Sequence, residues 1–164
     1  MDPGLEIKYV WNDEDVVEIR LSASNGSFAG VMEAYFGVGE LAEIAESLTG
    51  FPTNHNDTRD ISFGSTSMSA AGGAASLHFF CMDRTGTAFI DVSIVADPVS
   101  FDGGQRARFA LPIEAHALDV FVTNLRVLEQ SKNQAVLAAS GRNWHHGTSR
   151  AVLKHSLEKL LRET

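Results

Sequence analysis

The sequence predicts an α+β fold in which an antiparallel sheet of about six or seven strands, built from hairpins, is covered on one face by helices. Short runs of alternating apolar and polar residues are separated by turn sequences, which is typical of strands with one buried face. Longer segments carry apolar residues at helical spacing. The 164 residues suffice for one domain with a substantial core. The alternative is a small β-sandwich or barrel with flanking helices.

The first strands lie near the N-terminus. Residues 5–11 predict one strand, and residues 15–36 predict a hairpin around Asn25-Gly26, the dipeptide favoured in two-residue turns. Alternate residues of the first arm are apolar: Val17, Ile19 and Leu21. This arm is therefore expected to place one face on the core.

A helix is predicted over residues 38–49. Its apolar stripe consists of Leu41, Ile44, Ala45 and Leu48. Gly50 is placed as a C-terminal cap, and Pro52 blocks continuation of the helix.

The second half of the chain is also predicted to form strands followed by a helix. Strands are predicted at 61–63, 75–82, 87–96 and 106–111. Pro112 is expected at the entrance to a helix over 113–130, whose apolar ladder should lie across the sheet. Close strand neighbours joined by tight turns favour antiparallel pairing.

The composition changes after residue 130. We interpret residues 1–130 as a single α+β domain and residues 131–164 as a basic helical tail, packed on that domain or at an oligomer interface. Residues 1–130 hold 7 Lys and Arg and 19 Asp and Glu (7 − 19 = −12), and the tail holds 6 and 2 (6 − 2 = +4). A helix is predicted at 151–162, with the apolar positions Val152, Leu153, Leu157, Leu160 and Leu161.

These features restrict the classes of partner. An acidic body argues against nucleic acid, because Lys and Arg supply most of the affinity for phosphate backbones. No apolar run approaches the ~20 residues needed to span a bilayer, so no membrane partner is expected. Cys81 is the only cysteine, so no internal disulfide can form, and a cytoplasmic protein is expected.

Histidines are the first candidates for chemistry. His145 and His146 are adjacent in a polar segment beside Trp144. They lack a nearby acid or cysteine at ligand spacing, and a third metal ligand would have to come from elsewhere, such as His55 or His155. A solvated polar loop is the favoured interpretation.

His78 and Cys81 are three residues apart in a predicted strand, so they are expected on opposite faces and poorly placed as a catalytic pair. His116 lies in the first turn of a predicted helix, where a hydrogen-bonding role is the default interpretation. The sequence predicts no catalytic, cofactor-binding or metal-binding residues, and no cofactor.

A row of carboxylates is the remaining candidate. Glu40, Glu43 and Glu46 recur at three-residue steps on one face of the predicted helix 38–49. Such a row is ordinarily the solvated side of an amphipathic helix, and it is also the predicted partner-binding surface.

Three stretches within residues 15–130 resemble WapI-type bacterial immunity proteins and a related uncharacterised bacterial family. The matching features are Gly26, Phe28 and Gly30 at a turn exit, Glu40-Leu41 at a helix start, Asp83 and Gly86 in a hairpin, and a closing Leu/Phe helix. These features specify turns and packing, and they transfer no catalytic residue. The loop 51–60 and the tail depart from the family pattern.

The resemblance implies a non-enzymatic domain that neutralises a basic toxin by surface complementarity, with which an acidic body is compatible. Two other functions remain open. One is an enzyme or metal-binding protein that uses clustered histidines. The other is a structural domain that forms homo-oligomers through the C-terminal helix.

Overall fold

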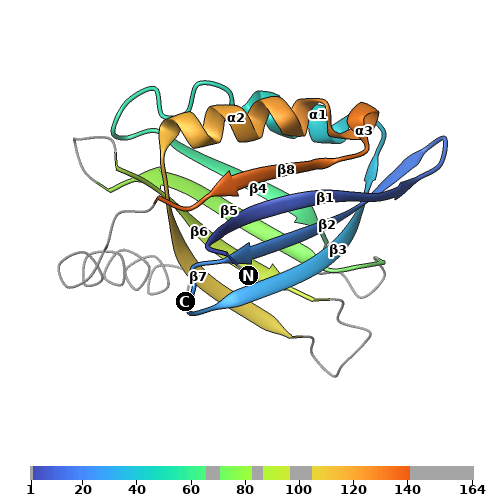
Figure 1. The fold of residues 1–164 in the computed structure, drawn as a ribbon, viewed down its shortest axis with the longest axis horizontal. Coiled ribbons are helices and arrows are strands. Elements are labelled where there is room, and N and C mark those ends of the chain that lie inside the picture. Colours follow the sequence, from blue (N-terminus) through green and yellow to red (C-terminus); the bar gives the residue numbers. More distant parts are fainter. Residues whose placement is uncertain (1, 66–70, 83–86, 97–104, 141–164) are drawn as a thin grey trace.

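The computed structural model describes residues 2–65, 71–82, 87–96 and 105–140. The elements in chain order are β1 (Gly4–Asn12), β2 (Val16–Ser24), β3 (Ala29–Gly37), α1 (Glu40–Leu48), β4 (Thr58–Gly64), β5 (Ala74–Cys81), β6 (Ala88–Val95), β7 (Arg106–Ile113), α2 (Ala115–Arg126), α3 (Leu128–Ser131) and β8 (Gln134–Ala138). In Figure 1, α1, α2 and α3 lie together at one end of the described part of the chain, with the strands below them.

The strands form two sheets. The first has the order β3-β2-β1-β8 and the second has the order β4-β5-β6-β7, and every pairing is antiparallel. The predicted single sheet of six or seven strands is therefore wrong, whereas the α+β class and the antiparallel pairing are confirmed. The division between the sheets falls at α1 in the chain: β3 before it is the edge of the first sheet, and β4 after it pairs with β5.

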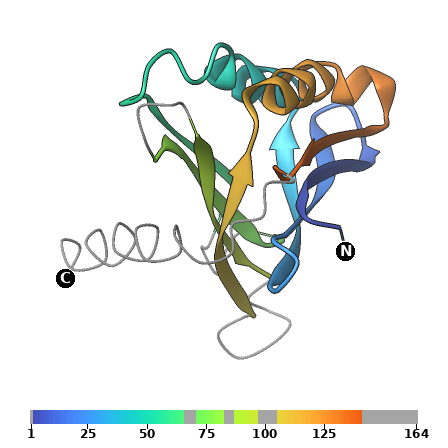
Figure 2. The same cartoon turned by 60° about the vertical axis from the view of Figure 1, so that its left-hand side comes forward.

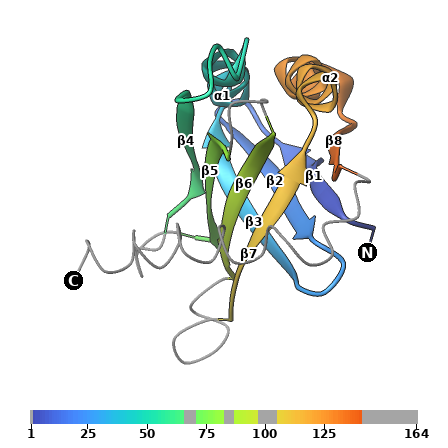
Figure 3. The same cartoon turned by 90° about the vertical axis from the view of Figure 1, so that its left-hand side faces the viewer.

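The two sheets approach each other at β3. A Cβ added at Gly30 would lie 3.1 Å from the Cβ of Ala107 and 3.2 Å from the Cβ of Ile94. The N–H of Gly73, just before β5, donates to the carbonyl oxygen of Glu33 at 2.7 Å. Viewed from the side, α1 and α2 lie over the end at which the sheets are farther apart (Figure 3). One hydrophobic core fills the space enclosed by the sheets and helices.

The first hairpin has the predicted strands but a different turn. Val17, Ile19 and Leu21 are buried, as their alternation predicts. The connection, however, runs through four residues from Asn25 to Phe28, and only Gly26 has a positive φ. The side-chain oxygen of Asn25 accepts hydrogen bonds from the N–H groups of Ser27 and Phe28. This local side-chain turn competes with the predicted two-residue turn.

The helices follow their apolar stripes. In α1, Leu41, Ala45 and Leu48 are buried, and Gly50 follows the C-cap with a φ of 72°. Figure 2 shows α1 and α2 lying across the ends of the strands. The predicted helix 113–130 is divided at Val127 into α2 and α3.

Pro112 lies within β7 and not at the helix entrance. Among the described strands, β7 lies at the edge of its sheet and pairs with β6 alone. An edge position tolerates the missing N–H of proline. The strand therefore continues to Ile113.

The segment after residue 130 also differs from the prediction. Gln134–Ala138 form β8, which pairs with β1 from Gly4 to Lys8. Ala135 and Leu137 of β8 are fully buried. The boundary predicted at residue 130 therefore falls before the last strand of the first sheet. The helix predicted at 151–162 lies outside the described residues.

Candidate functional site

Three segments bring carboxylates to one end of the molecule, here called the acidic end: Asp13, Glu14 and Asp15 of the β1–β2 turn, Glu40 and Glu43 in the first turn of α1, and Glu129 of α3. The N–H of Val38 donates to the carbonyl oxygen of Asp15 at 3.2 Å, which holds the β1–β2 turn beside the start of α1. The acidic end is thus assembled from segments that are distant in sequence.

Two hydrogen bonds order the turn. The Asp13 carboxylate accepts from the N–H groups of Asp15 at 2.9 Å and Val16 at 2.8 Å. These bonds hold the pKa of Asp13 below its ordinary value. Asp13 therefore stays charged at neutral pH while it shapes the turn.

The start of α1 is anchored by α3. The N–H of Gly39 donates to both carboxylate oxygens of Glu129, each at 3.0 Å. A carboxylate at this position is favoured because the N-terminus of a helix carries partial positive charge. Lys132 follows α3, and its ammonium group lies 5.7 Å from the centroid of the Tyr9 ring, so the end also carries a cation.

Exposed apolar side chains accompany the carboxylates. Trp11, at the end of β1, is 49% exposed, and Val38, between β3 and α1, is 56% exposed. Trp11 is opposite Glu18 in the strand register, and the Tyr35 hydroxyl donates to Glu18 at 3.2 Å. Trp and Tyr are enriched among the residues that contribute most of the binding energy at protein interfaces.

The predicted row on α1 is exposed along its whole length, but its members differ in their contacts. Glu40 and Glu43 belong to the acidic end. Glu46 lies at the other end of α1, where it accepts from Arg126 of α2 at 2.8 Å. Arg126 also donates to Thr49. Glu46 thus joins the two helices.

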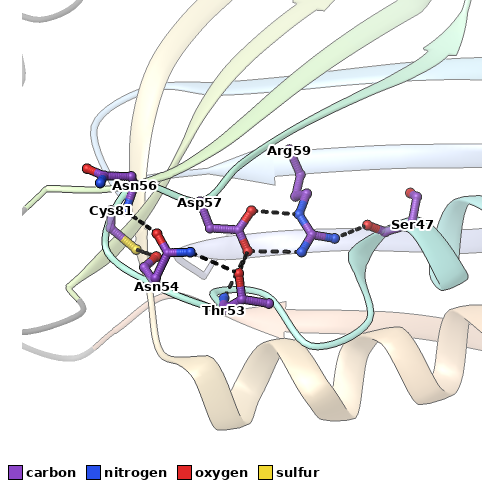
Figure 4. A network of polar contacts seen from close by, with 7 residues as sticks. All are labelled: Ser47, Thr53, Asn54, Asn56, Asp57, Arg59 and Cys81. Carbon is purple, nitrogen blue, oxygen red and sulfur yellow. Dashed lines mark hydrogen bonds and ion pairs between the residues drawn. The ribbon is translucent and has the colours of Figure 1, made fainter.

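A second polar cluster lies in the loop between α1 and β4 (Figure 4). Arg59 donates to both carboxylate oxygens of Asp57 and to the carbonyl oxygen of Ser47. Asp57 also accepts from the N–H and hydroxyl of Thr53. The hydrogen bonds that Arg59 donates to Asp57 lower the pKa of Asp57 well below its ordinary range. The same bonds raise the pKa of Arg59. These mutual contacts order the loop.

The predicted histidine candidates lie on separate elements. His55 is in the loop between α1 and β4, and His116 is exposed in the first turn of α2. His78 of β5 lies 2.7 Å from Asp60 of β4 through its Nδ1 atom. His145, His146 and His155 lie outside the described residues, as do Asp83 and Gly86.

Cys81 is half-buried at the end of β5, with its sulfur 4.0 Å from the carbonyl oxygen of Asn54. Among the residues that the structure describes, no group of three or more His, Cys, Asp and Glu side chains is placed to hold a metal ion. Within the same part of the chain, no helix has the length and apolar character needed to cross a membrane.

Comparisons with known proteins found no matching family model, no matching curated protein and no matching solved structure.

The sequence pattern indicated Glu40 and Glu43 but not the other components of the acidic end. The local sequence predicts only a polar turn at Asp13-Glu14-Asp15, and it places Glu129 as one acidic residue in a long helix. Their proximity to α1 depends on contacts between distant segments. The exposed Trp11 beside the acidic turn is the one local signal that could have indicated this surface.

Proposed function

We propose that this protein is a non-enzymatic, cytoplasmic domain that binds a basic protein through its acidic end. The observation that carries the proposal is that the carboxylates of three segments meet at the acidic end. Trp11, two residues before the β1–β2 turn, and Val38, bonded to that turn, are exposed near them. An aromatic anchor surrounded by charge is a common arrangement at protein interfaces. Carboxylates around the anchor would favour a partner rich in Lys and Arg and accelerate its association.

The sequence resemblance to WapI-type immunity proteins supports the same class of function and suggests a basic toxin as the partner. Inhibition would then arise by covering the toxin surface, without chemistry by this chain. The net charge of −8 is compatible with such a partner.

The experiment is a capture assay from bacterial lysate with the full chain as bait, followed by titration of the recovered protein at low and moderate salt. The test variant combines Glu14→Gln, Glu40→Gln and Glu43→Gln. The matched control combines Asp2→Asn, Glu6→Gln and Asp119→Asn, which removes the same formal charge away from the acidic end. A further variant, Trp11→Ala, tests the apolar anchor.

Selective loss of binding in the test variant and in Trp11→Ala is the expected result. Equal weakening in the test and control variants would show that net charge, and not this surface, attracts the partner. Recovery of no protein other than the bait would contradict the proposal, and so would a partner whose binding is unaffected by all three variants.

A further inference from the structure

The outer face of the second sheet carries two aromatic side chains that are buried outside the core. Phe79 and Ile90 point into the core, so their neighbours Phe80 and Phe89 point to the opposite face of the sheet. Phe80 is 5% exposed and Phe89 is 4% exposed, although neither belongs to the core cluster. Their rings stack on each other with centroids 5.9 Å apart.

Polar and charged side chains continue this layer. His78 stacks on Phe80 at 5.5 Å and pairs with Asp60 of β4. In the strand register His78 is opposite Asp91, whose carboxylate accepts from Arg108 at 2.7 Å. The Asp91 side chain is only 13% exposed. The outer face of an antiparallel sheet is ordinarily solvated, so such low exposure of both Phe rings and a carboxylate indicates a covering layer.

We propose that residues 141–164 of the same chain dock on this outer face. The first reason is that the last described residue, Ser140, is bonded to the edge strand of this sheet. The N–H of Ser140, after β8, donates to the carbonyl oxygen of Pro112 at 2.9 Å. Pro112 is the register partner of Phe89, which in turn is opposite Phe80. Ser140, the residue before this segment, therefore lies at the β7 edge of the second sheet, in register with Phe89 and Phe80.

The second reason is the size and pattern of the segment. The helix predicted at 151–162 would be about 18 Å long, and four adjacent strands span about 14 Å. Its apolar positions, Val152, Leu153, Leu157, Leu160 and Leu161, form one side. That side would lie on the Phe rings, and the basic side would face solvent. Because Arg108 and Asp91 neutralise each other on the sheet, apolar contact is the main attraction.

The proposal concerns a different surface from the acidic end and does not depend on the proposed function. It is tested by paramagnetic broadening of the full-length protein in a Cys81→Ser background. A nitroxide label on Ser76→Cys, at an exposed site of the outer face of β5, is the probe. The same label on Lys8→Cys, on the outer face of the first sheet, is the matched control.

Docking predicts that the label at position 76 broadens amide signals of residues 151–162 and that the label at position 8 leaves them sharp. Equal broadening by both labels, or none, would overturn the proposal. A mixture of isotope-labelled chains without nitroxide and unlabelled chains with nitroxide distinguishes contact within one chain from contact between two copies. Broadening in that mixture would assign the face to a second copy instead.

Side-chain signals give an independent measurement. In the full chain, Leu157→Asp with Leu161→Asp is expected to shift the ring signals of Phe80 and Phe89. The ring signals of Phe63, which lies in the core, should not move. Unchanged Phe80 and Phe89 signals in this variant would also refute docking.

Discussion

The backbone N–H of Gly39 donates to both carboxylate oxygens of Glu129, each at 3.0 Å, and so joins the start of α1 to α3 across 90 residues of sequence. Gly39 has a φ of 92° and no side-chain cap bonds the helix at this residue. The distant carboxylate therefore accepts from the N-cap N–H, as the side chain three residues into the helix does in a capping box.

Replacing Glu129 by Ala is expected to lower the free energy of unfolding by about 1 kcal/mol, in the range measured for lost helix caps. Urea denaturation monitored by circular dichroism measures the change. Glu129→Gln is the control, because it keeps one oxygen acceptor and loses the charge. An Ala variant as stable as the wild type would show that the contact contributes nothing to stability.

Substituting Ala at Gly64 and at Gly50 distinguishes the cost of a steric clash from the cost of backbone strain. Both glycines have a positive φ, 67° at Gly64 and 72° at Gly50. A Cβ added at Gly64 would lie 2.1 Å from the carbonyl oxygen of Gly73, whereas a Cβ added at Gly50 would have no other atom within 4 Å. Gly50→Ala should cost roughly 1–2 kcal/mol of stability through strain alone. Gly64→Ala should cost more by about 1–3 kcal/mol, the usual range for overpacking. Thermal denaturation compares them, and equal losses would contradict the predicted clash.

Leu137 tests whether β8 is part of the folded core. It is fully buried, whereas its neighbour Val136 is 43% exposed on the other face of the strand. Leu137→Ala is expected to destabilise the protein by about 2–5 kcal/mol, and Val136→Ala by about 0.5 kcal/mol or less. Chemical denaturation of the two variants measures the difference. Similar, small losses would mean that β8 contributes little to stability.

The lowered pKa of Asp57 predicts how the free energy of unfolding depends on pH. Its pKa is lowered in the folded protein by the hydrogen bond from Arg59. The charged form therefore stabilises the folded state, fully above the unfolded pKa of about 4, and this stabilisation is lost as pH falls toward the lower, folded pKa. Asp57→Asn should be less stable than wild type at pH 7 and at pH 5, with a difference that narrows below about pH 4.

Urea denaturation at each pH measures that difference. Asp119→Asn, on the exposed side of α2, controls for the change in net charge. A stability difference for Asp57→Asn that stays constant from neutral to acidic pH would argue against the ion pair as its cause.

Local pattern determined much of the secondary structure. Alternation along residues 15–24 placed β2 with the correct face inward, because successive side chains of a strand point to opposite sides. The stripe of α1 and the stop at Gly50 were also predicted, since helical spacing and a left-handed C-terminal glycine are local properties. The side-chain turn of Asn25 and the strand position of Pro112 were missed, because each depends on choices between competing local conformations.

Only the tertiary structure decided which segments become neighbours. β8 is five residues long, too short for its alternation to stand out, and its partner β1 lies about 130 residues earlier in the chain. The division into two sheets and the acidic end likewise arise from contacts between distant segments. Local sequence determines φ, ψ and the direction of side chains. Strand partners and surface clusters depend on how all elements bury their apolar faces together.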